Sequence, residues 1–523
     1  MAEPGAPGAP GEAAPADLGF SAAAFVLALL PRLYVAIAWA REPVWDGHYY
    51  DFGARRIAAG LGYSDELILA GRAVWHPWCH YPVGYSGFLG IAYRLFGHGP
   101  SVGPIANAIT GALLVVLVHR LARRATTPAR ARIAAALAAL SPGLIAYAAL
   151  LMTEPLAALG LLAAPWLLAR DLERRPLRGA ALAGLALGLA TLVRPQSLLC
   201  APALGLLALG HARGSGGTAR SSTGGAPAGG PPPWRVAAAV GAKTASVALA
   251  TALLVVAPWT LRNCRVMDGC ALVSTNGGWN LAIGAFPRAT GRFETLRAGD
   301  GCPTARGQVQ QDRCWMREGL RWIREDPARW VGLMPVKLGF TFDHESFPMG
   351  YLGEADPAAW PEARKALGRG VLTTAHRALL VAAALGLVGW PRRGRPREQL
   401  AQLAALALVA GLALHGVLRD DHPFWPLALA IPLLAALPLP GRPPIGGVLG
   451  YLAFAVASVA ATHAVFFGED RYHIVVTPAL CILAACALRR SAGAPERRPT
   501  RDDEPDPAEH RRHPSRPRGT RSC

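Results

Sequence analysis

The sequence predicts an all-α polytopic membrane protein with about twelve transmembrane helices, because apolar stretches long enough to span a bilayer recur along the chain. Of its 523 residues, 52% are apolar and 17% are charged, and the mean hydropathy is +0.27. A water-soluble protein of several domains would be less apolar. The bilayer is therefore the expected solvent for most of the chain.

The predicted spans fall into two groups of six. In the first half they lie near residues 18–40, 102–123, 131–149, 153–170, 178–194 and 196–211. In the second half they lie near residues 236–258, 372–390, 399–418, 423–440, 444–467 and 472–488.

This grouping predicts two membrane modules. Residues 18–211 form the first, which is expected to be the catalytic module, with an outer loop at 41–101 that bears interfacial helices. Residues 236–488 form the second, with a larger outer loop at 259–371 between the seventh and eighth predicted helices. A Gly/Ser/Pro-rich cytoplasmic linker, residues 212–235, joins them.

Arginine placement predicts the orientation, because basic residues in short loops stay on the cytoplasmic side during insertion. Three alternate loops carry the clusters Arg120, Arg123, Arg124, Arg130 and Arg132; Arg170, Arg174, Arg175 and Arg178; and Arg392, Arg393, Arg395 and Arg397. Both polar ends, residues 1–17 and 489–523, are then cytoplasmic, and their composition predicts disorder. This topology explains the formal charge of +19 without a nucleic-acid partner. The Arg-, Ala- and Pro-rich composition favours a bacterial inner membrane of a high-GC organism.

The cysteines and one polar loop bear on disulfides and metals. At least one disulfide is predicted among the outer Cys264, Cys270, Cys302 and Cys314. No cysteine pair has the CxxC spacing of a zinc site, so the cysteines predict no metal. The RDDHP sequence at 419–423 gathers oxygen and imidazole ligands that would suit a divalent cation, although a solvated loop is the stronger interpretation.

The first outer segment carries the main catalytic candidate. Residues 46–60, DGHYYDFGARRIAAG, predict an amphipathic helix at the membrane interface, and Asp46 begins it shortly after the first span. A carboxylate at this position can accept a proton from an acceptor hydroxyl. The same residue is also well suited to start a helix, a role worth about 1 kcal/mol.

Five segments in order resemble the GT-C superfamily of membrane glycosyltransferases. They are DGHYYDFGARRIAAGLGYSD with YPVGYSGFLGIAYRLFG, LLMTEPLAALGLLAA, LALGLATLVRPQSLL, APWTLRNCRVMDGCALVSTNGGWNLAIG and EDRYHIVVTPAL. The similarity is to the protein O-mannosyltransferase and lipid A aminoarabinose transferase group, family 39-like, and covers most of residues 18–488. It implies a hexosyl or pentosyl transferase that takes its sugar from a polyprenyl-phosphate carrier, inverts the anomeric carbon and glycosylates an extracytoplasmic acceptor.

The resemblance implies roles for three acids. Asp46 falls on the family's first-loop acid, the base that activates the acceptor. Relatives often have a second acid next to it, where this chain has Gly47, so Asp51 is a candidate substitute partner. Glu154 in MTEPL matches an acid at the outer end of the fourth helix. Its neighbours Thr153 and Pro155 also make an ordinary helix start.

The expected partners of the carrier phosphate and the sugar come from several segments. His80 stands where relatives have a cation before a proline, and it is a weaker cation than lysine near neutral pH. Arg194 and Arg471 are the preferred phosphate ligands, with Arg55 as a further candidate; snorkelling to the interface is the alternative for each. Further substrate contacts are expected from Tyr85 and Asn276.

Two other classes of function compete. A transporter or flippase of lipid-linked glycans would show charged or broken helices near mid-membrane and repeat symmetry, which are not clear in this sequence. A polysaccharide polymerase or ligase usually lacks an acid in the first loop, so Asp46 disfavours it. No glycine-rich nucleotide-binding loop occurs, which favours a lipid-linked donor. The acceptor, whether lipid, glycan or protein, stays open.

Overall fold

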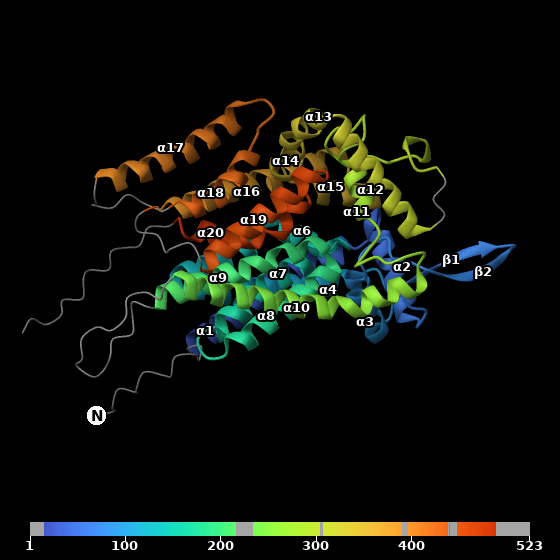
Figure 1. The fold of residues 1–523 in the computed structure, drawn as a ribbon, viewed down its shortest axis with the longest axis horizontal. Coiled ribbons are helices and arrows are strands. Elements are labelled where there is room, and N and C mark those ends of the chain that lie inside the picture. Colours follow the sequence, from blue (N-terminus) through green and yellow to red (C-terminus); the bar gives the residue numbers. More distant parts are fainter. Residues whose placement is uncertain are drawn as a thin grey trace, which may run out of the picture. The chain divides into compact units, whose positions relative to one another are not determined.

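The computed structural model describes residues 15–215, 234–303, 307–389, 396–437, 439 and 447–487. Within these residues the chain is mostly helical, and its one sheet is a two-stranded hairpin (Figure 1). Most of the predicted linker, residues 216–233, and most of the two polar ends lie outside the described residues.

Seven described helices are long and apolar enough to cross a membrane. They are α1 (Pro15–Ala38), α4 (Val102–Ala125), α8 (Pro176–Val193), α10 (Trp234–Val266), α16 (Glu362–Val388), α17 (Pro396–Leu418) and α19 (Val448–Val465). An eighth span arises if α5 (Pro128–Leu140) and the following turns through Ala149 count as one, although they bend by 52° at Pro142. Each of these eight corresponds to a predicted span.

The other four predicted spans are short, broken or charged, so a count of twelve is not confirmed. They correspond to α7 (Glu154–Asp171), to η2 (Pro195–Cys200) with α9 (Ala201–Ser215), to α18 (Trp425–Ala436), and to η4 (Tyr472–Val475) with α20 (Thr477–Ala485). Every residue of α20 is buried. Since neighbouring helices rather than lipid surround it, this helix needs neither the length nor the uniform exposure of a lipid-facing span.

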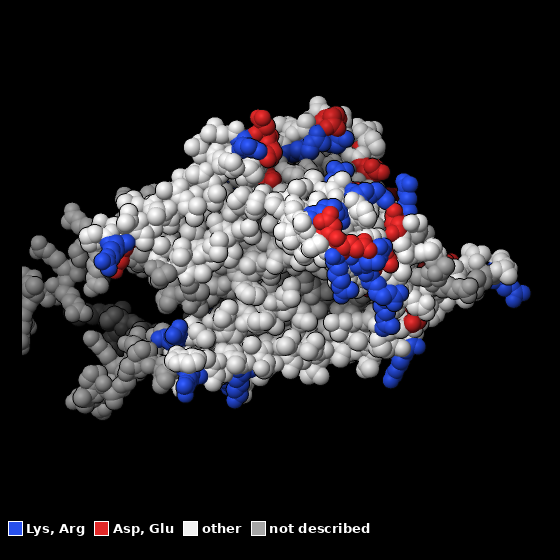
Figure 2. Space-filling view, turned by 45° about the horizontal axis from the view of Figure 1, so that its top comes forward, with Lys and Arg blue, Asp and Glu red and all other residues white. Residues whose placement is uncertain are grey.

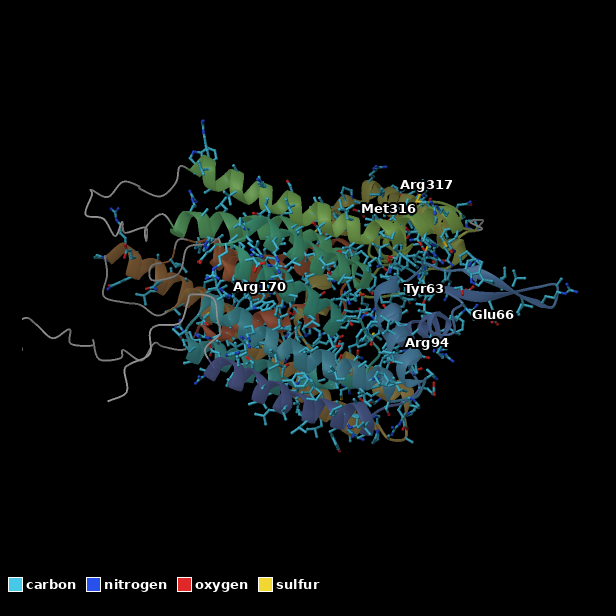
Figure 3. All side chains as sticks on the ribbon, turned by 90° about the horizontal axis from the view of Figure 1, so that it is seen from below. Tyr63, Glu66, Arg94, Arg170, Met316 and Arg317 are labelled. Atoms are coloured by element: carbon cyan, nitrogen blue, oxygen red, sulfur yellow. A yellow bond between two sulfur atoms is a disulfide. The ribbon has the colours of Figure 1, made fainter. Side chains whose placement is uncertain are left out.

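Charged residues mark the two ends of the helical bundle. In the face shown in Figure 2, Lys, Arg, Asp and Glu gather toward the ends, and the surface between them is mostly uncharged. Figure 3 places Arg170, from a predicted cytoplasmic loop, at the end opposite Tyr63, Glu66, Arg94 and Arg317. These four residues come from the two predicted outer segments. Both segments therefore share one end of the bundle.

The first outer segment folds into α2 (Asp46–Ala58), β1 (Ser64–Leu69), β2 (Arg72–Pro77) and α3 (Val83–Phe96). The helix over 46–60 was predicted and is confirmed. The antiparallel hairpin was not predicted. Its two-residue turn, Ala70 and Gly71, has positive φ at both positions, which is the geometry that matches the twist of a tight hairpin.

The second outer segment is shorter than predicted, because α10 continues to Val266 and α16 already begins at Glu362. Between them lie α11 (Gly277–Ile283), η3 (Ala298–Asp300), α12 (Gln308–Glu325), α13 (Pro327–Gly332), α14 (Met334–Phe342) and α15 (Phe347–Ala355). Two disulfides, Cys264–Cys270 and Cys302–Cys314, confirm the prediction of at least one. The segment also docks on the first, since the side-chain oxygen of Gln308 in α12 accepts a hydrogen bond from the backbone nitrogen of Cys79 at 2.9 Å.

Candidate active site

The start of α2 positions Asp46 by an unusual backbone turn. Trp45 has a φ of 51°, in the left-handed region that a bulky residue rarely adopts, at a typical cost of about 1 to 3 kcal/mol. Its ring packs against Phe347 and Tyr351. A side chain at Gly47 would collide with the hydroxyl of Tyr351. The structure therefore leaves no room at 47 for the second acid that relatives carry.

Two side chains bind the carboxylate of Asp46. The hydroxyl of Tyr81 donates to Oδ1 at 2.7 Å, and Nη1 of Arg471 donates to Oδ2 at 2.5 Å. Burial by itself would raise the pKa of Asp46, but the positive charge of Arg471 and these hydrogen bonds hold the pKa below its usual value. Asp46 is thus an ionised carboxylate whose negative charge is matched by one arginine.

Arg471 is shared between two acids. Its Nε lies 2.6 Å from Oε2 of Glu469, and its guanidinium lies 5.1 Å from the ring centroid of Phe347. Burial raises the pKa of Glu469 to about 7, an effect that Arg471 opposes and that Asp46 and Asp470 reinforce. Glu469 therefore changes its protonation state near neutral pH, beside the arginine that holds Asp46.

Glu154 and Arg194 form a second, deeper ion pair. Glu154 is fully buried at the start of α7, and Nη1 of Arg194 donates to its Oε1 at 2.5 Å. The same nitrogen donates to the hydroxyl of Thr153 at 3.1 Å. The amide oxygen of Gln196, when turned toward Arg194, accepts from Nε at 2.9 Å. These partners compensate the buried charges of Glu154 and Arg194, which would be very costly to bury alone.

The ring of Tyr472 links the two ion pairs. The guanidinium carbons of Arg194 and Arg471 both lie 5.1 Å from its centroid, within the range of cation–π attraction. His463 of α19 stacks on the same ring at 3.9 Å. A small pocket beside it is lined by Arg194, Gln196, Ser197, Cys200, Ser458, His463 and Tyr472. Two cations and their acids are thereby gathered around one aromatic residue.

His80 lies beside this cluster, close enough to Asp46 for their charges to interact. The ring of His80 makes edge contacts with Tyr81 and Trp279 at 5.0 and 5.8 Å. Burial lowers the pKa of His80, and the nearby Asp46 opposes this only in part. A neutral imidazole is a poorer phosphate ligand than the predicted cation. The side chain of Asn276 accepts a hydrogen bond from Ser274 at 2.8 Å.

Three expected site residues lie elsewhere. Asp51 is buried and bound by Tyr93 at 2.7 Å, by Arg55 at 2.9 Å and by His98 at 3.3 Å. Neither Asp51 nor Arg55 is brought into the cluster, because five residues of α2 turn Asp51 onto a different face from Asp46. Tyr85 is fully buried and donates to Asn107 at 3.0 Å, a contact between helices.

Several residues of the site were not predicted individually. Tyr81, Glu469 and Tyr472 stand next to or near predicted residues in the strings HYPVG and EDRYH, and Gln196 follows Arg194 by two positions. Because Glu469 and Tyr472 flank the candidate phosphate ligand Arg471, the sequence could have indicated them as further site residues. The RDDHP loop forms an exposed Arg419–Asp421 ion pair, which agrees with a solvated loop.

The fold and the site together define a multi-pass helical membrane protein with a cluster of paired acids and arginines at one end of its bundle. Residues 80–221 match a protein family described as dolichyl-phosphate-mannose-protein mannosyltransferase. This confirms the resemblance to the GT-C membrane glycosyltransferases that the sequence motifs indicated. The matched region, about a quarter of the chain, contains Glu154 and Arg194 but neither Asp46 nor Arg471. No curated protein matches the chain.

Solved structures of three membrane glycosyltransferases are distantly similar. The oligosaccharyltransferase AglB from Archaeoglobus fulgidus, in complex with an inhibitory peptide and a dolichol-phosphate, is 15% identical with a TM-score of 0.42; the match covers 91% of this chain and 50% of that one. ArnT from Cupriavidus metallidurans, bound to undecaprenyl phosphate, is 15% identical with a TM-score of 0.33, and coverage is 90% and 76%. Arabinosyltransferase EmbB from Mycobacterium smegmatis is 16% identical with a TM-score of 0.29, and coverage is 85% and 40%. The chain thus spans about half the length of the archaeal protein. The roles proposed below for individual residues rest on the geometry of this chain alone.

Proposed function

We propose that this protein is an integral membrane glycosyltransferase that moves a sugar from a polyprenyl-phosphate carrier to an extracytoplasmic acceptor. The single observation that carries the proposal is the ion pair between Asp46 and Arg471. In the proposal Asp46 is the base for the acceptor and Arg471 is the cation for the leaving phosphate, and their contact supports a shared site. The family match over residues 80–221 and the sequence resemblance support the same reaction.

In the free protein Arg471 is paired with Asp46, and we expect it to exchange this partner for the carrier phosphate when the donor binds. The carrier phosphate is an anion that competes with Asp46 and Glu469 for the same guanidinium. As Arg471 turns toward the phosphate, Asp46 loses the charge that holds its pKa low and becomes a better base. Donor binding would therefore activate the carboxylate that the acceptor needs.

The transfer step then follows from the two roles. Asp46 removes the proton of the acceptor hydroxyl as its oxygen attacks the anomeric carbon, and the bond from that carbon to the phosphate oxygen breaks. Arg471 stabilises the phosphate that leaves, and Arg194 contacts the same ring of Tyr472 as Arg471 does. Direct attack inverts the anomeric carbon, as the resemblance to the superfamily implies.

The proposal includes an orientation. The end of the bundle that carries α2 (Figure 1) and Tyr63 (Figure 3) faces outward, and the end with Arg170 faces the cytoplasm, in a bacterial inner membrane with both termini inside. The acceptor is a lipid, a glycan or a protein of the cell envelope.

The test in cells is mass spectrometry of glycolipids and glycans from a deletion strain. Complementation with the wild-type gene should restore a glycosylated species that the deletion strain lacks. Complementation with Asp46→Asn, expressed to the same level, should not. An envelope that is unchanged by the deletion would contradict the proposed function.

A further inference from the structure

A second cluster of ionisable side chains lies outside the proposed active site. It consists of Glu345, in the loop between α14 and α15, His376 of α16 and His473 of η4. The three residues are no more than 4% exposed. One potential ligand atom from each lies within 4.8 Å of the other two. No other such group of three occurs among the residues that the structure describes.

Backbone carbonyls fix the tautomer of both histidines. Nδ1 of His473 lies 2.8 Å from the carbonyl oxygen of Thr341, and Nε2 of His376 lies 2.9 Å from that of Phe342. A carbonyl oxygen only accepts, so each of these ring nitrogens carries the proton. Nε2 of His473 and Nδ1 of His376 are then lone-pair nitrogens. Neither has a hydrogen-bond partner in the described structure.

The carboxylate of Glu345 lies near these two nitrogens, and no hydrogen-bond donor to them or to its Oε1 is found among the described residues. Its Oε2 lies 3.5 Å from Nε2 of His473, too far for a good hydrogen bond, and its Oε1 has no partner among the described residues. The two histidine rings stack at 3.7 Å. The carboxylate lies where a side chain at position 143 would stand, a place that Gly143 leaves open.

Oε1 of Glu345, Nδ1 of His376 and Nε2 of His473 are buried without a hydrogen-bond partner among the described residues, which is unfavourable because each has lost its water. A metal ion would satisfy all three at once. We propose that Glu345, His376 and His473 form a binding site for a divalent transition metal of the zinc class. Two imidazoles and one carboxylate suit zinc and disfavour magnesium or calcium, which prefer oxygen ligands. The carbonyl contacts of the remote ring nitrogens are the usual outer partners of metal-bound histidines.

The position of the cluster suggests what the metal would do. His473 follows Arg471 by two residues, and the loop between Glu469 and His473 supplies Arg471 and Tyr472 to the proposed active site. Asp470 in the same loop accepts from the backbone nitrogens of Ser346 and Phe347, next to Glu345. A metal would tie this loop to α16 and to the end of α14. It would act as a positioning element that holds Arg471 against Asp46, rather than as a catalytic ion.

The test measures metal content. Full-length protein with a histidine-free affinity tag is purified in detergent, exposed to zinc, freed of unbound metal and analysed by mass spectrometry for metals. One equivalent of zinc per chain is expected, with a loss of affinity of about tenfold or more in Glu345→Gln and His376→Gln. His119→Gln is the control: His119 is also buried, but its ring contacts the hydroxyl of Ser21. It should retain the metal.

A second measurement uses only the folded wild-type protein, in case the variants fold poorly. Zinc should raise its thermal unfolding temperature, and a chelator should lower it, because a ligand that binds only the folded state stabilises it. Folded wild-type protein that retains no zinc and does not respond to either reagent would overturn the proposal. Equal loss of zinc in His119→Gln would overturn the assignment to this cluster.

Discussion

The guanidinium of Arg471 lies 2.5 Å from the carboxylate of Asp46, although 425 positions separate the two residues in the sequence. The fold brings the start of α2 and the turn before η4 together at one end of the bundle. In the proposed mechanism, this acid and this cation are paired before substrate arrives and exchange partners during catalysis. The following predictions concern this exchange and the residues around it.

Replacement of Asp46 by Asn should reduce sugar transfer by about a hundredfold or more, because the amide keeps the shape of the carboxylate but accepts no proton. The rate is measured on purified protein with a lipid-linked donor. Asp300→Asn is the control, since Asp300 is an acid of the second outer segment that pairs with Arg288 away from the site. Near-normal turnover of Asp46→Asn would remove Asp46 from the mechanism.

Replacement of Arg471 by Gln should weaken binding of a polyprenyl phosphate about tenfold or more, because a charge-assisted hydrogen bond is worth about 1.5 to 3 kcal/mol. Binding is measured by titration in detergent or nanodiscs. Arg288→Gln, at an exposed ion pair, should leave the affinity unchanged. Equal affinities for Arg471→Gln and the wild type would show that the phosphate binds elsewhere.

Replacement of Arg194 by Gln should lower stability as well as donor affinity, since it leaves the fully buried Glu154 without its cation. Breaking a buried ion pair from one side costs about 3 to 5 kcal/mol. The double variant Arg194→Gln with Glu154→Gln should recover much of that loss while donor binding stays weak. Thermal unfolding of the four proteins in the cycle provides the measurement. A double variant less stable than Arg194→Gln would contradict this reading of the pair.

Donor affinity should fall as pH rises through about 7. Burial raises the pKa of Glu469 to about 7, so the side chain is neutral below that pH and negative above it. The ionised form competes with the donor phosphate for Arg471 and adds to the negative charge of Asp46 and Asp470. Binding measured on both sides of neutrality should show this step in the wild type. Glu469→Gln should lack it, and a step that persists in the variant would assign it to another group.

Most of the helices could be predicted from the sequence, because hydrophobic length is a local signal. The outward position of the two segments, which rests on arginine placement, stays a prediction. The candidate residues Asp46, Glu154, Arg194 and Arg471 were also predicted, and the structure places all four around Tyr472 and its neighbours. Their pairing was not predictable. Which acid meets which arginine depends on how distant helices pack, and no spacing in one sequence encodes that.

Two further features show the same limit. α20 was predicted as a span from its apolar composition, and it is buried among other helices. A helix in such a position has the same apolar composition as a lipid-facing span but need not be as long. The cluster of Glu345, His376 and His473 follows no short motif, since its members come from a loop, a long helix and a 3-10 turn. Asp51 was a candidate partner of Asp46, but the two side chains lie on different faces of α2, because five positions along a helix do not return to the same face.

The most direct test of the central claim is a choice of donor. Purified protein in lipid nanodiscs, with acceptors extracted from the membrane, is offered either polyprenyl-phosphate sugars or soluble nucleotide sugars, and transfer and release of the carrier are measured. The account predicts that a polyprenyl-phosphate sugar is consumed, that free polyprenyl phosphate is released, and that both depend on Asp46. Transfer from a nucleotide sugar, with the lipid-linked donor left untouched, would contradict it.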